Sequence, residues 1–199
     1  NLADSRITDN GSLVTVNSNI SVPDNFYIGL NANAEGLHAI AIGTEASANA
    51  TNNLAIGYRT TTLYTNNTAI GAGAKAGSIY GVYGDPGNRN NLAIGLDSLA
   101  NGYESIAIGR NALTTSQGGV AIGSSYTGLD SEGGAQAGSN SGALFGTEDV
   151  AIGSRARAHG GSSVAIGGLA YTSDTPAFGE FGVAIGYQSS IYDLEGVAI

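Results

Sequence analysis

The sequence of 199 residues contains no cysteine, methionine or tryptophan. The lack of cysteine excludes a disulfide framework, a thiolate nucleophile and a thiolate metal site. Only 12% of the residues are charged and the formal net charge is −9, so the basic footprint of a nucleic-acid-binding protein is missing. No apolar run approaches the roughly 18–20 residues that span a bilayer, and no signal-peptide pattern is present. We therefore expect neither nucleic-acid binding nor direct membrane insertion.

Glycine, by contrast, is abundant, with 32 copies. Such a content disfavours helices, because glycine is a poor helix former. The chain begins on Asn1 and ends on Val197-Ala198-Ile199, without the glycine that follows the other repeated isoleucines. We interpret the sequence as a piece of a longer protein, whose targeting and anchoring segments lie elsewhere.

The tripeptide Ala-Ile-Gly, or a near copy, recurs eleven times between Ile28 and Ile199. Internal repeats of this kind set the fold of a chain. Seven of the ten spacings between successive isoleucines equal fourteen residues, and the other three are 24, 30 and 19. The longer spacings are fourteen residues plus an insertion. They predict insertions near residues 78–89, 127–147 and 173–181.

Each repeat predicts two short strands. The position two residues before the isoleucine is apolar in every repeat except at Thr68, and alternation with period two is typical of a strand with one buried face. Glycine follows the isoleucine wherever a residue follows, and small residues recur four and six residues after it, which predicts a tight corner and a second strand. The isoleucine column is the expected structural core: Ile28, Ile42, Ile56, Ile70, Ile94, Ile108, Ile122, Ile152, Ile166 and Ile185.

A parallel β-roll, or β-solenoid, explains this pattern better than a helix does. Glycine in every unit costs a helix about 1 kcal/mol each time, and β-branched residues prefer strands. Residues 26–199 are therefore predicted to form an all-β column of fourteen-residue rungs, roughly 50 Å long at ~4.8 Å per rung. Residues 1–25 lack the repeat, and short strands there would serve as a cap or as a connector.

So narrow a rung buries few large side chains, and the margin of stability for a single chain is thin. We therefore expect a second apolar surface that packs against neighbouring chains. Four leucines outside the predicted inward columns are the candidates for it: Leu63, Leu99, Leu113 and Leu169.

Repeats such as Ser163-Val-Ala-Ile-Gly-Gly-Leu-Ala170 and Ser105-Ile-Ala-Ile-Gly-Arg-Asn-Ala112 resemble the head of YadA-like trimeric autotransporter adhesins. The resemblance runs from about Phe26 to Ile199. It implies a homotrimer of left-handed parallel β-rolls on the bacterial cell surface, anchored in the outer membrane by parts outside this sequence. It also implies attachment to a host extracellular-matrix protein, a cell-surface receptor or a glycan. Similar repeats occur in trimeric phage tail fibres, so a virion fibre for host recognition is the alternative.

The insertions are the preferred candidates for recognition, because loops on a rigid scaffold carry binding more often than the scaffold itself. Exposed aromatic residues are favoured anchors at interfaces. The candidate receptor-binding residues are Tyr80, Tyr83, Arg89, Phe145, Phe178 and Phe181. The alternative is that the aromatic side chains fold back over the column or a neighbouring subunit. Tyr58, Tyr126 and Tyr187 are expected to pack outside the column or between chains.

No residue pattern indicates catalysis, a cofactor or a metal. The two histidines, His38 and His159, fall at different places in the repeat and are expected in solvated turns. The acidic pairs near residues 130–132 and 148–149 are expected in solvated loops rather than in calcium sites. An ice-binding face would need the threonines of 60–62 on every rung, and a polysaccharide-cleaving enzyme would need an acidic column. Neither pattern is present.

Overall fold

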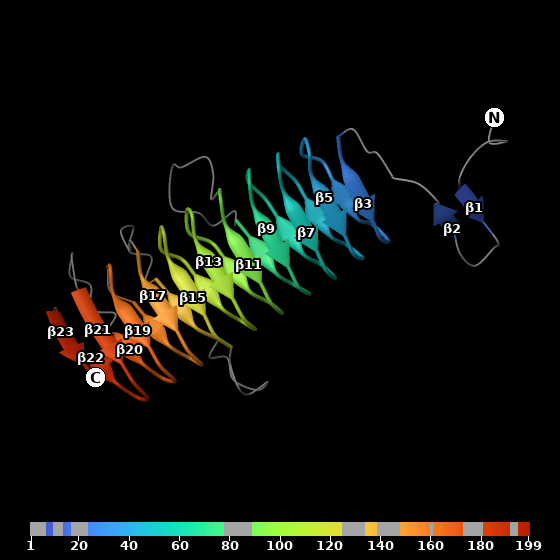
Figure 1. The fold of residues 1–199 in the computed structure, drawn as a ribbon. Coiled ribbons are helices and arrows are strands. Elements are labelled where there is room, and N and C mark those ends of the chain that lie inside the picture. Colours follow the sequence, from blue (N-terminus) through green and yellow to red (C-terminus); the bar gives the residue numbers. More distant parts are fainter. Residues whose placement is uncertain are drawn as a thin grey trace.

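The computed structural model describes residues 7–9, 14–16, 24–77, 89–124, 134–138, 148–159, 161–172, 181–191 and 195–199. These residues form only strands and turns, and most of them lie in one long column of short parallel strands (Figure 1). Beyond the β3 end of the column, β1 (Ile7–Asp9) pairs antiparallel with β2 (Val14–Val16). Short strands are thus present in the segment before the repeat, as expected.

The column consists of two sheets, and each rung contributes one strand to each. In the first sheet eleven strands follow one another in sequence order, and all neighbours are parallel. They are β3 (Phe26–Ile28), β5 (Ile40–Ile42), β7 (Leu54–Ile56), β9 (Thr68–Ile70), β11 (Leu92–Ile94), β13 (Ile106–Ile108), β15 (Val120–Ile122), β17 (Val150–Ile152), β19 (Val164–Ile166), β21 (Phe181–Ile185) and β23 (Glu195–Ala198).

The second sheet holds ten shorter strands, again all parallel and in sequence order. They are β4 (Asn33–Ala34), β6 (Ser47–Ala48), β8 (Thr61–Thr62), β10 (Lys75–Ala76), β12 (Leu99–Ala100), β14 (Leu113–Thr114), β16 (Gln136–Ala137), β18 (Arg157–Ala158), β20 (Tyr171–Thr172) and β22 (Ser190–Ile191).

The fourteen-residue repeat is one full turn of this coil. Ile42 stands in register with Ile56, and Ile56 with Ile70. The longer spacings leave the register intact, since Ile70 pairs with Ile94 across 24 residues. The predicted parallel β-roll of constant rungs is therefore confirmed, and its register is the same on both sides of the longer spacings.

The second predicted insertion is interrupted by a strand of the roll. Within the range 127–147, Gln136 pairs with Leu113 of the rung before and with Arg157 of the rung after. Ala135 and Ala137 are buried beside it. The prediction of one continuous insertion is thus wrong, because residues 134–138 complete a second-sheet strand. The small residues at alternate positions are the sequence signal for that strand.

The interior of the coil is lined by alanine instead of isoleucine. Ala55, Ala93 and Ala107 each stand between the two large apolar residues of a first-sheet strand and are fully buried, and Ala48 and Ala76 face them from the second sheet. Threonine also fits on the second-sheet side, and Ile191 is buried where the first sheet has Gly182 and Gly196. The two sheets are therefore close enough that a larger side chain on one side requires a small residue opposite it.

The isoleucines point outward on the single chain. The predicted column does stack in register, but Ile28 is 54% exposed and Ile152 is 37% exposed. The assignment of these residues to the chain's own interior is therefore wrong: Ile28, Ile42, Ile56, Ile70, Ile94, Ile108, Ile122, Ile152, Ile166 and Ile185 are half-buried or exposed.

Together with the apolar column two residues earlier, the isoleucines form what we call the apolar face. It covers the outer side of the first sheet along the whole column, with Leu54, Leu92 and Val120 as members of the second column. The leucines expected to form an interchain surface lie elsewhere. Leu63, Leu99, Leu113 and Leu169 are half-buried on the second sheet or at the corners of the rungs.

The first rung differs from the others at its inward position. Tyr27 stands in register with Ala41, where every later first-sheet strand has alanine, and it is 63% exposed. A tyrosine ring does not fit between two rungs that are spaced for methyl groups. Tyr27 therefore closes this end of the alanine column.

The corner after each first-sheet strand requires glycine. Gly57 has φ +136°, and a Cβ atom there would lie 2.6 Å from the carbonyl oxygen of Gly71 on the next rung. Both the backbone conformation and the close approach of the next rung exclude a side chain.

We predict that Gly57→Ala lowers the free energy of unfolding by at least about 2 kcal/mol, because it combines a strained φ with a backbone clash. Equilibrium denaturation measures this loss. Gly168→Ala, at a corner position without positive φ and facing only the Tyr187 side chain, is the control and should change stability by less than about 0.5 kcal/mol. Equal losses in the two variants would contradict the explanation.

Candidate functional site

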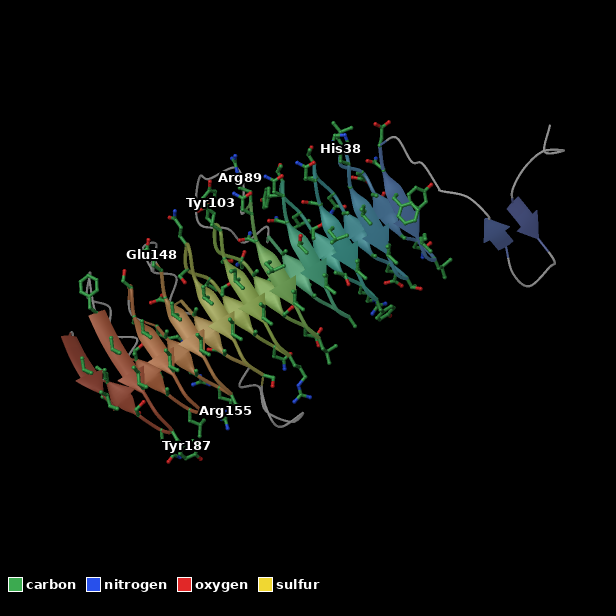
Figure 2. The ribbon with its side chains drawn as sticks, viewed as in Figure 1. His38, Arg89, Tyr103, Glu148, Arg155 and Tyr187 are labelled. Atoms are coloured by element: carbon green, nitrogen blue, oxygen red, sulfur yellow. The ribbon has the colours of Figure 1, made fainter. Side chains whose placement is uncertain are left out.

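Each rung has two corners of different chemistry. The glycine corner joins a first-sheet strand to the second-sheet strand, and the polar corner joins the second-sheet strand to the next rung. Figure 2 shows His38, Arg89, Tyr103 and Glu148 along one long edge of the column, which is the polar corner. Arg155 and Tyr187 lie along the opposite edge, at the glycine corner.

The predicted insertions share the polar corner. Three long interruptions of the described chain come directly after the second-sheet strands β10, β16 and β20. They follow residues 77, 138 and 172, and the chain resumes at residues 89, 148 and 181. A further interruption, after residue 124, lies at the glycine corner. The described residues that flank the first and third predicted insertions, and those that flank residues 139–147, therefore lie at the polar corner.

Two of the six candidate receptor-binding residues are described, and both mark a return to the roll. Arg89 is exposed, and its carbonyl oxygen accepts a hydrogen bond from the Glu104 amide at 3.1 Å. Phe181 opens β21, pairs with Glu195 and is 57% exposed. The other four candidates, Tyr80, Tyr83, Phe145 and Phe178, lie outside the described residues.

An exposed ladder of amide side chains runs along the polar corner. Asn52 donates to the Oδ1 atom of Asn66 at 2.9 Å, and Asn66 donates to that of Asn90 at 3.0 Å. Asn90 in turn reaches Glu104 at 3.4 Å. The three asparagines have φ of 59°, 60° and 61°, a left-handed conformation that asparagine tolerates better than most residues. The edge between the insertions thus presents ordered polar groups.

A second, buried ladder runs beside the first, one residue further along the chain. The Oδ1 atom of Asn53 accepts from the Asn67 amide at 2.9 Å, and that of Asn67 accepts from the Asn91 amide at 2.8 Å. Asn91 accepts from the Ser105 amide at 2.9 Å. Repeated Asn-Asn pairs therefore supply one exposed and one buried amide to each turn, and the buried one ties each polar corner to the next.

The glycine corner displays aromatic and charged side chains. The Arg59 Nε atom donates to Glu45 of the preceding rung at 2.6 Å, and the guanidinium lies 4.9 Å from the centre of the Tyr58 ring. The hydrogen bond and charge of Glu45 raise the pKa of Arg59. Tyr58 and Tyr187 are 49% and 73% exposed, so their expected place outside the column is confirmed.

The two histidines occupy different environments. His38 is exposed in a turn, as predicted. His159 is buried after β18, where its ring meets the edge of Tyr171 at a centroid distance of 5.9 Å. Its assignment to a solvated turn is therefore wrong. Within the described ranges, no three His, Asp or Glu side chains gather as metal ligands, and no helix has the length and apolar character of a membrane span.

One acidic residue assigned to a solvated loop lies inside the roll. Asp149 is fully buried and accepts hydrogen bonds from the amide and hydroxyl of Ser163 at 3.0 and 2.9 Å. Burial raises the pKa of this carboxyl to about 6, although the two bonds from Ser163 oppose the shift. Asp149 occupies the position of the buried asparagines, three residues before the isoleucine of its rung. Alignment of the repeats is the signal that locates it.

Rungs of constant length, parallel register and a glycine corner define a parallel β-roll repeat protein. The sequence matches the family described as YadA head domain repeat (2 copies), over residues 28–46, 34–60, 92–112, 100–125 and 146–170. The matched residues are therefore similar to YadA head repeats, as the repeat sequence predicts.

Comparison with curated proteins finds no match. Among solved structures, the chain is similar to the collagen-binding domain of the Yersinia adhesin YadA, with 23% sequence identity and a TM-score of 0.40. The match covers 85% of this chain and 70% of that one. The strand registers and the repeat by themselves define the fold.

We predict that Asn67→Ala lowers the free energy of unfolding by about 1–3 kcal/mol, because the buried Asn91 amide loses its acceptor. Asn66→Gly removes the neighbouring exposed amide at a left-handed position, and should change stability by less than about 0.5 kcal/mol. Chemical denaturation of the two variants makes the comparison. A loss in Asn66→Gly as large as that in Asn67→Ala would show that burial does not distinguish the two ladders.

Proposed function

We propose that three copies of this chain pack their apolar faces together, and that the trimer is the head of a cell-surface adhesin. The observation that carries the proposal is the continuous apolar face on the outer side of the first sheet. In a single chain it leaves Ile122, Ile152 and Ile185 37%, 37% and 38% exposed. Soluble monomers rarely expose contiguous apolar surface on this scale.

Three-fold packing suits this surface. Closed symmetry lets each rung of one chain meet the same rung of its neighbours, so two apolar side chains per rung are covered at every level. Burial of an isoleucine or valine stabilises by about 1.5–3 kcal/mol when complete. The alanine interior of each coil supplies little of this term, so most of the hydrophobic stabilisation comes from the contact between chains.

The trimer would display the polar corner as its recognition edge. The residues that flank the predicted insertions lie on this edge at three levels, and the exposed amide ladder lies on the turns around the first of them. The fixed rungs hold the insertion ends at set heights, as a rigid scaffold holds binding loops. We infer that the insertions attach the head to host extracellular-matrix proteins, cell-surface receptors or glycans. The head is then a bacterial surface structure that binds, and it catalyses no reaction.

We predict that Ile94→Asp abolishes the trimer, because it places a charge within the apolar face at three equivalent points. Sedimentation equilibrium of the wild type should give three times the chain mass, and the variant should give smaller species. Ile94→Ala keeps the face neutral and should shift dissociation to higher protein concentration. Lys75→Asp, exposed on the second sheet, is the control and should remain trimeric. A wild-type chain that sediments as a folded monomer would refute the proposal.

We predict that replacing residues 78–88 with a Gly/Ser linker weakens surface attachment at least tenfold and leaves the trimer intact. Solid-phase binding to a panel of matrix proteins (collagen, the ligand of the similar Yersinia domain, among them), glycans and cultured cells measures this. The same replacement at 139–147 and 173–180 completes the series, and Lys75→Asp, on the exposed face of the second sheet, serves as the scaffold control. Unchanged attachment in all three loop variants would place recognition on the rungs themselves.

A further inference from the structure

Asp149 is the one acidic residue in the column of buried ladder positions. Its counterparts Asn53, Asn67 and Asn91 are neutral amides of the same shape. The Oδ1 atom of Asp149 accepts both bonds from Ser163, whereas Oδ2 is buried and has no hydrogen-bond partner among the described residues. A charged oxygen without a partner is costly in an interior, and the cost falls when the group is neutral.

The rung on the other side gives the carboxylate no support. Gly119, directly below Asp149 in the column, has no side chain, and the Ser116 hydroxyl fills the space that a Cβ there would take. The Ser116 hydroxyl is also buried without a partner within the described ranges. Asp149 therefore begins a new stretch of the ladder instead of continuing the one that ends at Ser105.

The remaining bonds around Asp149 form a chain of hydroxyl groups. Thr172 donates to the Ser163 hydroxyl at 3.0 Å, and the Ser163 hydroxyl donates to Asp149. The backbone amide of His159 donates to Thr172 at 3.2 Å. The carboxyl is thus tied to the rung above through neutral groups.

Four titratable or charged side chains lie on the turns and strands packed around Asp149. They are Glu148 beside it on the exposed polar corner, Arg155 on the glycine corner, Arg157 in β18 and His159 after β18. The described hydrogen bonds to the carboxylate come from Ser163 alone. Burial raises the pKa of Asp149, and the two bonds from Ser163 act in the opposite direction.

We propose that Asp149 makes the roll sensitive to acid: on taking up a proton it tightens the junction between the rungs of β15, β17 and β19, and on losing the proton it loosens that junction. Asp149 is placed where this matters, because it follows Glu148, the residue at which the chain re-enters the roll after the interruption at 139–147. The device is independent of trimer formation and of any receptor.

The direction of the pH effect on stability follows from the difference in the pKa of Asp149 between the folded and unfolded chains. Burial raises the pKa of Asp149 from 3.8 to about 6, so between these values the folded chain binds the proton more strongly. The stability from this group is greatest at low pH, falls as pH rises from about 4 to 6, and is constant above. The folding equilibrium should weaken about a hundredfold in all, with about tenfold of the change between pH 5 and pH 7.

Asp149→Asn tests the proposal, because asparagine fills the same position in four other rungs. Unfolding by denaturant and amide hydrogen exchange of the complete chain are compared at pH 5 and pH 7. The variant should lose the roughly tenfold pH effect of the wild type and should be more stable than the wild type at pH 7. Exchange of the amides at Val120 and Ser163, which report the two junctions, should slow at pH 7.

Two further variants keep the test decisive. Glu148→Gln removes the adjacent exposed carboxylate and should keep the wild-type pH response. Asp149→Ser places the residue found at the same position in two rungs, at 105 and 163, and should behave as Asp149→Asn does. If both Asp149 variants retain the full wild-type difference between pH 5 and pH 7, or if the carbon-13 resonance of the Asp149 carboxyl titrates near pH 4, the proposal is wrong.

Discussion

The separation of the two sheets decides the rest of this structure. Fourteen residues close a turn with a three-residue strand, a two-residue strand and two tight corners, and the space left between the strands accepts small side chains, mostly alanine and threonine. Alanine therefore fills the interior, and glycine fills the corner where the next rung approaches closely. The large apolar residues of the first-sheet strands lie on the outer side of that sheet. A chain built this way has a well-packed but thin core.

The two edges of the coil differ in how much sequence variation they accept. At the glycine corner, successive rungs approach so closely that the backbone leaves no room for a Cβ atom. At the polar corner, the turn is held by side-chain amides of one rung bonded to backbone of the next, and the register is kept across the 24-residue spacing from Ile70 to Ile94. Variation in sequence length is thereby confined mainly to one side of the column.

The period, the parallel register and the glycine corner could be predicted from the sequence because they recur in every unit. Which side chains of each strand point into the roll could not be predicted. In Leu54-Ala55-Ile56, alternation fits either alanine or its large neighbours on the inside, and only the sheet separation decides between them. The strand within residues 134–138 was missed because long non-repeating segments lie on both sides of it in the sequence. His159 and Asp149 were missed because they are buried by contacts with other rungs. The candidate residues in the insertions stay predictions, apart from the positions of Arg89 and Phe181.

Tyr27 gives the column a fixed origin, and this has a consequence for how such proteins vary in length. Beyond the first rung, every first-sheet strand presents the same alanine methyl group to the strands before and after it. Duplication of one fourteen-codon segment would lengthen the rod by a single strand spacing, ~4.8 Å, with little change to either neighbour. The length of the rod is therefore a quantity that evolution can adjust in small, equal steps.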